Sequence, residues 1–224
     1  MPFATFSRNP LVSNRFTHFF HQPHYALSFY APYMKAFIEI LREKYGLAQP
    51  ETEKLLEQME LLTYRKGEHI VREGERNSSF YLVADGIWRG HYLRDGVDIS
   101  LWFAFQGDSI FSSWGYVAGL PSLVSIEAMS DSRVYRISKS KLETFFSSSV
   151  LFANIGRIIF ERQFLDMENW MINGGAAQAK QRYLTLLEQN PELLQHVPLK
   201  HIASYLFITP QSLSRIRAEL SKKK

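Results

Sequence analysis

Residues 197–220 read VPLKHIASYLFITPQSLSRIRAEL, and this stretch predicts two short helices joined by a tight turn. Apolar residues recur at helical spacing in its first half, which gives one buried face: Leu199, Ile202, Ala203 and Leu206. Thr209 followed by Pro210 marks the start of the second helix, because a hydroxyl caps free amide groups and proline needs no amide partner at the first helical position. The pattern is typical of a helix-turn-helix motif.

The second helix of this stretch is expected to present a polar edge. Its buried face continues through Leu213, Ile216 and Leu220, so Gln211 and Arg215 lie one turn apart on another face. Arginine can make two hydrogen bonds to a guanine edge and glutamine two to an adenine edge. We therefore predict a DNA-binding helix in the major groove, with these candidate contacts: Lys200, Thr209, Gln211, Ser212, Ser214, Arg215 and Arg217. The alternative is an ordinary helical hairpin with a solvated arginine.

The turn between the two helices carries an unusual residue. Phe207 stands where this motif usually has a glycine in a left-handed conformation. A bulky residue in that conformation is strained by about 1–2 kcal/mol. Either the turn has a different geometry, or burial of the phenyl ring compensates for the strain.

The composition indicates a protein of two parts that does not enter a membrane. The 224 residues suffice for one medium domain and one small domain, and a hydrophobic content of 46% suffices for a core. No apolar run is long enough to span a membrane, and the N-terminus lacks the order of a signal peptide, so we expect a cytoplasmic location. The absence of cysteine excludes disulfides, thiolate metal sites and cysteine-ligated iron–sulfur clusters.

The net charge of +4 is distributed unevenly along the chain. From Asn173 onward there are eight basic and three acidic residues, a net charge of +5, which leaves 18 basic and 19 acidic residues before that point, a net charge of −1. The excess positive charge therefore lies on the predicted DNA-binding part, as neutralisation of phosphates requires. For Lys222, Lys223 and Lys224 taken alone, a solvated basic tail is the alternative.

The middle of the chain predicts a β-domain. Between Thr63 and Ser138, glycines punctuate short apolar and aromatic runs, which is the pattern of strands and turns. Runs such as FYLVADG and DISLWFAF are rich in β-branched and aromatic residues. The run SIEAMSDSRVYRIS adds two strands around a turn at Asp131–Ser132. About eight short strands that close on themselves predict a jelly roll.

Helices are predicted on both sides of the β-domain. Two precede it, over residues 34–45, where Gly46 closes the helix, and over residues 50–62. A long helix, Val150–Ile172, follows and is apolar on two faces: Leu151, Ile155, Ile158 and Leu165 on one, and Phe160, Phe164, Met167 and Met171 on the other. We expect one face to cover the β-domain and the other to meet a twofold-related copy. The alternative is a helix buried wholly within one chain.

The N-terminal segment and the segment between the long helix and the C-terminal motif have fewer recognisable sequence patterns. Asn173-Gly174-Gly175 predicts a hinge, and a helix over residues 176–189 leads into the C-terminal motif. Residues 1–33 are either a flexible N-terminal extension or sequence upstream of a later start, because a more regular pattern begins at Met34. The histidines at positions 18, 21 and 24 do not indicate a metal site, since Pro23 opposes the helix that would align them.

From about Met34 to the C-terminus the chain resembles the cyclic AMP receptor protein/FNR family of bacterial transcription regulators. The order of the elements carries the resemblance, together with five segments: YRKGEHIVREGE (64–75), YLVADGIWRG (81–90), GDSIF (107–111), IEAMSDSRVYRIS (126–138) and residues 197–220. The compact ending is similar to the branch of this family that is common in Bacteroidetes.

The resemblance implies an α+β protein in which a cyclic-nucleotide-binding-like β-roll (jelly roll) with flanking helices is followed by a long dimerisation helix and a helix-turn-helix domain. The expected parts are the extension (1–33), the sensor domain (34–149), the dimerisation helix (150–172) and the DNA-binding domain (173–224). It further implies a homodimer that binds double-stranded DNA, contacts RNA polymerase and responds to an unknown small-molecule effector or to none. In the family, positions matching Gln211, Ser212 and Arg215 contact bases.

The residues that hold a cyclic nucleotide in the family are replaced here. The resemblance places a glutamate for the ribose and an arginine for the phosphate at positions where this chain has Ser112 and Ser122, and a shift of one residue offers only Ser113. Without its arginine a phosphodiester loses a strong charge-assisted pair of hydrogen bonds. We therefore expect a degenerate pocket that does not bind cyclic nucleotides in the usual manner; its candidate residues are Phe111, Ser112, Ser113, Trp114 and Ser122.

Two other functions are alternatives. A ligand-sensing or interaction module that no longer binds DNA is favoured by Phe207 in the turn. An enzyme of the cupin type would share the roll, but it needs clustered histidines, and the β-region has only His69 and His91 without a His-x-His pair. The sequence also contains no nucleophile elbow and no phosphate loop. We therefore expect no enzymatic activity, no cofactor and no metal site.

Overall fold

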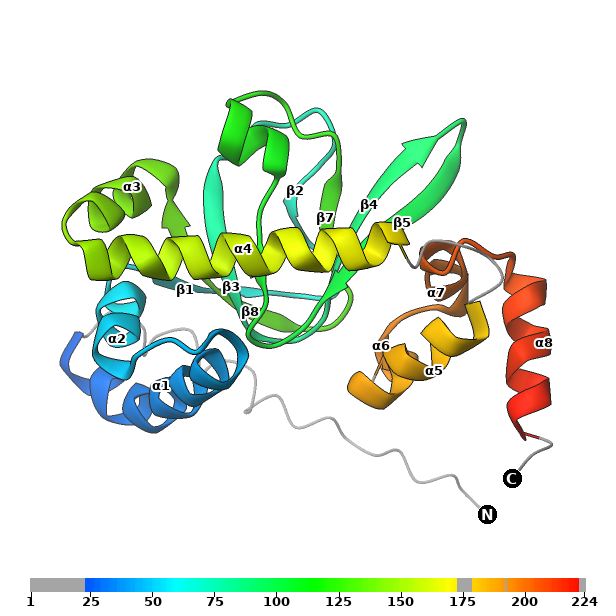
Figure 1. Ribbon diagram of the computed structural model, residues 1–224, viewed down its shortest axis with the longest axis horizontal. Helices are drawn as coiled ribbons and strands as arrows, with labels where there is room; N and C mark the ends of the chain where they lie inside the picture. The colour runs from blue at the N-terminus through cyan, green and yellow to red at the C-terminus, as the bar shows by residue number, and fades with distance from the viewer. Residues whose placement is uncertain (1–22, 173–178, 192, 222–224) are drawn as a thin grey trace, which may run out of the picture.

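The computed structural model describes residues 23–172, 179–191 and 193–221. The elements follow one another in this order: α1 (Pro23–Tyr45), α2 (Gln49–Glu57), β1 (Glu60–Tyr64), β2 (His69–Val71), β3 (Ser79–Asp85), β4 (Trp88–Arg94), β5 (Val97–Ala104), β6 (Ser109–Ile110), the π-helical turn η2 (Trp114–Ala118), β7 (Ser125–Ala128), β8 (Ser132–Ser138), α3 (Lys139–Ser147), α4 (Val150–Ile172), α5 (Ala179–Gln189), α6 (Leu193–His196), α7 (Leu199–Tyr205) and α8 (Pro210–Ser221). In Figure 1 the strands occupy the centre, α4 runs across them, and α5 to α8 lie together at one end.

The eight strands form two antiparallel sheets, with the strand orders β1-β8-β3-β6 and β2-β7-β4-β5. The apolar side chains between the two sheets make one core: Val71, Tyr81, Val83, Trp88, Ala104, Ile110, Ile126, Ala128 and Val134. Two facing sheets of this kind constitute a jelly roll, so the predicted β-roll is confirmed.

Strand β3 explains why the run FYLVADG is apolar throughout. Side chains of a strand alternate between its two faces. Tyr81 and Val83 belong to the core between the sheets, whereas Phe80, Leu82 and Ala84 belong to a second core on the outer face of the sheet. Because both faces of β3 are covered, apolar residues occupy both sets of positions.

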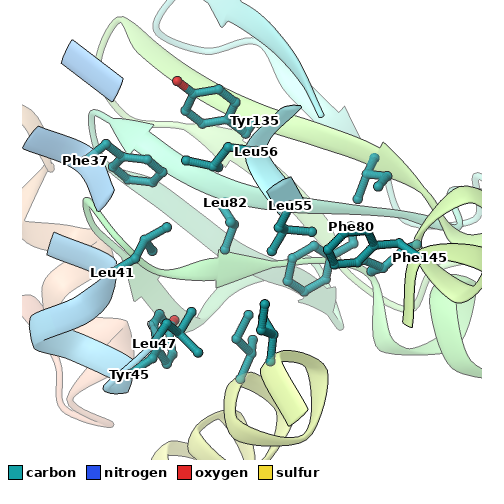
Figure 2. Close-up of a cluster of buried hydrophobic side chains, with 14 of the residues drawn as sticks. Phe37, Leu41, Tyr45, Leu47, Leu55, Leu56, Phe80, Leu82, Tyr135 and Phe145 are labelled. Atoms are coloured by element: carbon teal, nitrogen blue, oxygen red, sulfur yellow. The ribbon is translucent and has the colours of Figure 1, made fainter. Parts of the chain in front are cut away.

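The second core joins the outer face of the β3 sheet to the helices. Figure 2 shows Phe37 and Leu41 of α1 and Leu55 of α2 beside Leu82 of β3, with Phe145 of α3 near Phe80. From α4, Ile155 and Ile159 complete this core. The helices on both sides of the β-domain in the sequence thus cover one and the same sheet.

Several predicted boundaries differ from the structure. Helix α4 has the predicted bounds, but α1 begins at Pro23 rather than at Met34, so the chain is helical within the predicted extension. Proline is tolerated in the first turn of a helix, where its missing amide is no loss. Helix α2 ends at Glu57 and not at Leu62, because Leu61 and Leu62 pair with β8 as part of β1. Helices α3 and α6 were not predicted.

The C-terminal helices form a third core that includes residues of the β-roll. Tyr183 of α5, Leu193 of α6, Ile202 of α7 and Leu213 of α8 are buried in it together with Ile87, which follows β3. Helix α5 begins at Ala179, and the start at residue 176 and the hinge predicted for residues 173–175 lie outside the described residues. The two halves of the chain therefore share buried apolar surface in this arrangement.

Candidate nucleic-acid interface and its contacts with the β-roll

Helices α7 and α8, here called the C-terminal helix pair, occur where the sequence predicted them. Pro210 is the first residue of α8, and the hydroxyl oxygen of Thr209 accepts a hydrogen bond from the backbone amide of Ser212 at 3.1 Å. This is the expected N-terminal cap. Leu213 is fully buried and fixes α8 against its neighbours. Local sequence signals alone are enough to begin this helix at the right residue.

The turn before α8 has the left-handed conformation that is usual for this motif, although Phe207 occupies the position of the usual glycine. The φ angle of Phe207 is 56°, and the amides of Phe207 and Ile208 donate to the carbonyls of Ser204 and Ala203, both at 3.0 Å. The expectation that burial of the phenyl ring compensates for the strain is wrong, since the residue is 42% exposed. Instead the Arg182 guanidinium lies 5.9 Å from the ring centre, a distance at which a cation and an aromatic face attract each other.

The candidate DNA contacts lie on the outer side of the C-terminal helix pair. Gln211, Ser214 and Arg215 are exposed and Ser212 is half-buried, so the predicted edge faces solvent. Lys200 on α7 is exposed as well. Figure 1 shows α8 as the outermost helix at its end of the molecule. The face that carries Gln211 and Arg215 is therefore free of contact with the β-roll.

Arg217 differs from the other candidates. Burial raises the pKa of Tyr183 in α5, and the positive charge and a hydrogen bond of Arg217 lower it again in part. The guanidinium of Arg217 is thus turned toward the hydroxyl of Tyr183. Arg217 is nevertheless exposed, so it lies at the surface beside Tyr183.

The five candidate effector residues differ in their surroundings. Ser112 and Ser122 are buried, and their hydroxyl oxygens are hydrogen-bonded to each other at 2.8 Å. Phe111 stacks with Phe80 in the aromatic group beside α4. Ser113 and Trp114 are exposed at the start of η2. Ser112 donates this bond, and the hydroxyl of Ser122 donates to the carbonyl of Val124 at 2.6 Å, so both hydroxyl protons are used within the loop where the resemblance puts the nucleotide.

Helix α4 has one covered face and one open apolar face. Ile155 and Ile159 are buried in the second core with α1, α2, α3 and the β3 sheet, whereas these large apolar residues are exposed: Val150, Leu151, Phe164, Leu165, Met167, Met171 and Ile172. Leu151 and Leu165, which the sequence grouped with Ile155, are exposed, and the buried Ile159 was not among the predicted apolar residues. An apolar hollow on the open side is lined by Arg157, Phe160, Glu161, Phe164 and Leu165.

Sequence reasoning also missed a polar junction between α7 and the β4–β5 hairpin. Arg89 of β4 is 1% exposed and makes two hydrogen bonds, at 2.8 and 2.9 Å, to the carboxylate of Asp98 on β5. His201 of α7 is hydrogen-bonded to Arg89 and lies 3.7 Å from the same carboxylate. The hydroxyl of Ser204 accepts from the amide of Ser100 at 3.0 Å. Asp98 is thus shared by the roll and the C-terminal helix pair.

The junction keeps His201 uncharged. Burial, followed by the positive charge of Arg89, lowers the pKa of His201 from 6.5 to about 4, against the opposing effect of Asp98 and with smaller lowering effects of Lys200 and His91. In the unfolded chain the pKa returns to its ordinary value. The folded state therefore binds fewer protons than the unfolded state between these two pKa values.

We expect the protein to lose stability as the pH falls, in part through His201. The contribution of His201 is fully present above pH 6.5 and is lost as the pH falls through about 4. The free energy of unfolding, measured by urea titration in EDTA-containing buffer over this range, should fall less steeply in His201→Gln than in the wild type. His196→Gln, on α6, is the control and should keep the wild-type slope. Equal slopes for wild type and His201→Gln would contradict the assignment.

Comparison with known proteins agrees with the fold of the roll. Residues 61–149 match the family described as cyclic nucleotide-binding domain. No match to this chain was found among curated proteins. Among residues 23–172, 179–191 and 193–221, no helix combines the length and the hydropathy that a membrane span requires.

Three solved structures resemble the chain over most of its length. FixK2 from Bradyrhizobium japonicum has 22% identity and a TM-score of 0.62, with 74% of this chain and 85% of that chain covered. CLP from Xanthomonas campestris, a c-di-GMP responsive global regulator, has 16% identity and a TM-score of 0.63, with 79% and 93% covered. A CooA mutant from Carboxydothermus hydrogenoformans has 16% identity and a TM-score of 0.55, with 76% and 79% covered. At these identities the likeness concerns the fold.

Proposed function

We propose that this chain is a homodimeric DNA-binding transcription regulator of the cyclic AMP receptor protein/FNR type and not an enzyme. The observation that carries the proposal is the capped helix α8, whose Gln211 and Arg215 face solvent on the outermost element of the molecule. The net charge of +5 from Asn173 onward supports the same conclusion. FixK2 and CLP, to which the fold is similar, are regulators of this family.

The proposed dimer forms through α4. Large apolar side chains are exposed at its start, at Val150 and Leu151, and in its last turns, between Phe164 and Ile172, and a monomer would leave them in water. A twofold axis along α4 would set two copies of α8 to enter successive major grooves, about 34 Å apart. The site on DNA is then a pseudo-palindrome, and the complex would contact RNA polymerase. The proposed parts remain residues 34–149 as sensor, 150–172 as dimerisation helix and 173–224 as DNA-binding domain.

The proposed regulator does not use the cyclic-nucleotide mode of the family. The hydrogen bonds of Ser112 and Ser122 support this, because a bound phosphodiester would meet two neutral hydroxyls that already donate to other protein atoms. CLP responds to c-di-GMP. For this chain we propose an effector of other chemistry, or none.

The DNA-binding role can be tested with Arg215. Double-stranded fragments are first selected from a random library with the full-length protein at low salt. On the selected site, Arg215→Ala should weaken binding by about 1–3 kcal/mol and relax the preference at one base pair in each half-site, because a bidentate contact to a base is lost. Lys200→Ala should instead leave the base preference unchanged. It should reduce the slope of log K against log salt concentration by about one, because one phosphate contact is lost. Both effects are measured by gel shift over a salt series.

The matched control is Arg94→Ala, since Arg94 is an exposed arginine on β4. It should leave both the affinity and the base preference unchanged. If Arg215→Ala behaves like Arg94→Ala on the selected site, α8 is not the recognition helix.

A second candidate function is a sensing or interaction module that does not bind DNA. The engagement of α7 with the β4–β5 hairpin through Arg89, His201 and Ser204 favours it, because such contacts restrict the C-terminal helix pair. In that case, selection at low salt would enrich no DNA fragment.

A further inference from the structure

Three side chains from three neighbouring strands meet on one face of the roll. His69 of β2 and Glu127 of β7 are direct cross-strand partners, and His91 of β4 lies two positions along from the partner of Glu127. Residues directly or diagonally opposite across strands share a face of the sheet. One donor atom from each of the three side chains lies within 4.8 Å of the others.

The donors match the chemistry of a transition metal ion. Two imidazoles and one carboxylate are ligands that Zn²⁺ accepts at about 2.0–2.2 Å, which places tetrahedral donors about 3.4 Å apart. The distance between Nε2 of His91 and a carboxylate oxygen of Glu127 is 3.7 Å. Small side-chain rotations are therefore enough to bring all three donors onto one ion.

The ring nitrogens are buried without hydrogen bonds. Within the described part of the chain, Nδ1 of His69 and both ring nitrogens of His91 have no hydrogen-bond partner. A buried polar atom without a partner destabilises the folded state. A bound ion would remove this cost for the nitrogens that it coordinates, so the orphaned nitrogens point to a ligand independently of the donor spacing.

Asp98 supplies the outer support that a ligating histidine requires. Nδ1 of His91 lies 3.5 Å from a carboxylate oxygen of Asp98, on the side of the ring opposite to Glu127. A metal-bound histidine usually donates its other ring N–H to a carboxylate, which fixes the tautomer and the ring orientation. Asp98 would hold the proton on Nδ1 and leave the lone pair of Nε2 to the ion.

The charge of the surroundings also permits a cation. Arg89 lies 3.5 Å from Glu127 and is paired with Asp98 through two hydrogen bonds. Without an ion, the carboxylates of Asp98 and Glu127 carry two negative charges and the guanidinium of Arg89 carries one positive charge, so these three groups have a net charge of −1. Glu127 and Asp98 are 23% and 35% exposed, so an ion can reach the cluster from solvent.

From this geometry we propose that His69, His91 and Glu127 form a binding site for one divalent first-row transition metal ion of the Zn²⁺ or Co²⁺ class, with Asp98 as the positioning residue of His91. Three protein ligands leave a coordination position for water or for a small ligand. The site is separate from the proposed DNA-binding edge, and its test does not depend on DNA binding.

The test is a Co²⁺ titration of the full-length protein after treatment with EDTA, followed by visible absorption and by calorimetry. We expect one ion per chain, the absorption of a low-coordinate Co²⁺ site, displacement by Zn²⁺, and a thermal unfolding midpoint that rises with metal concentration. His91→Ala and Glu127→Gln should each weaken binding by more than about 100-fold, and Asp98→Asn by about 10–100-fold.

Two controls separate this site from other histidines. His196→Ala, and a variant with His18, His21 and His24 all replaced by alanine, should keep the affinity and the Co²⁺ spectrum. Circular dichroism verifies that each variant is folded, and His69→Gln replaces His91→Ala if that variant is not. Unchanged affinity in His69→Gln and Glu127→Gln, or loss of binding in the triple-histidine variant, would overturn the proposal.

Discussion

Replacing Arg89 by methionine is expected to lower the free energy of unfolding by about 3–5 kcal/mol. The Arg89 side chain is 1% exposed and compensates Asp98 and, at 3.5 Å, Glu127. Methionine fills much of the volume but leaves both carboxylates without their cation in a largely buried junction. Urea denaturation followed by circular dichroism measures the change.

A solvent-exposed arginine–aspartate pair provides the control for Arg89. Arg133 and Asp85 lie 3.1 Å apart on the surface, with side-chain exposures of 38% and 56%. Arg133→Met should cost about 1 kcal/mol or less, because solvent screens the pair. In the double variant Arg89→Met/Asp98→Asn the loss should be smaller than the sum of the two single losses. A loss for Arg89→Met no larger than that for Arg133→Met would refute the buried junction.

Charged substitutions on the open face of α4 are expected to abolish the dimer and, with it, most of the affinity for DNA. Phe164 and Met171 are 61% and 56% exposed, so Phe164→Glu/Met171→Glu should leave the fold of the chain intact. In a dimer, binding of one half-site holds the second DNA-binding domain close to the other half-site. Separate monomers lack this advantage, so their affinity for the full site should be about 100- to 10,000-fold lower. Sedimentation equilibrium gives the oligomeric state and gel shift gives the affinity.

The β4–β5 hairpin offers the matched control for α4. Leu93 on β4 and Val97 on β5 are apolar residues that are 61% and 60% exposed. Leu93→Glu/Val97→Glu should therefore remain dimeric and bind the selected DNA as the wild type does. If the α4 variant stays dimeric at micromolar concentration, the proposed interface is wrong, whatever the protein does with DNA.

The proposed metal site contradicts the expectation, based on the sequence alone, that the β-region holds no metal ion. His69 and His91 were set aside because no His-x-His pair accompanies them. Strand pairing places His69 directly opposite Glu127 and brings His91 to the same face. A ligand set spread over three strands leaves no spacing signature in the chain, since the register between strands is absent from a single sequence.

The sequence alone determined those features whose causes lie within a few residues of chain. Thr209 and Pro210 began α8 at the right position, the apolar run FYLVADG indicated a strand, and α4 had its predicted bounds. Hydrogen bonding in caps and the periodicity of apolar side chains are local, so they can be read directly from neighbouring residues.

Only the tertiary structure decided which distant residues meet. Arg89 and His201, 112 positions apart, come into contact because the register of β4 with β5 and the packing of α7 coincide. The conformation of the loop around η2 likewise joined Ser112 to Ser122, and packing in the second core decided that Ile159 is covered while Leu165 is exposed. Such contacts depend on the whole set of packed elements, and no local pattern encodes them.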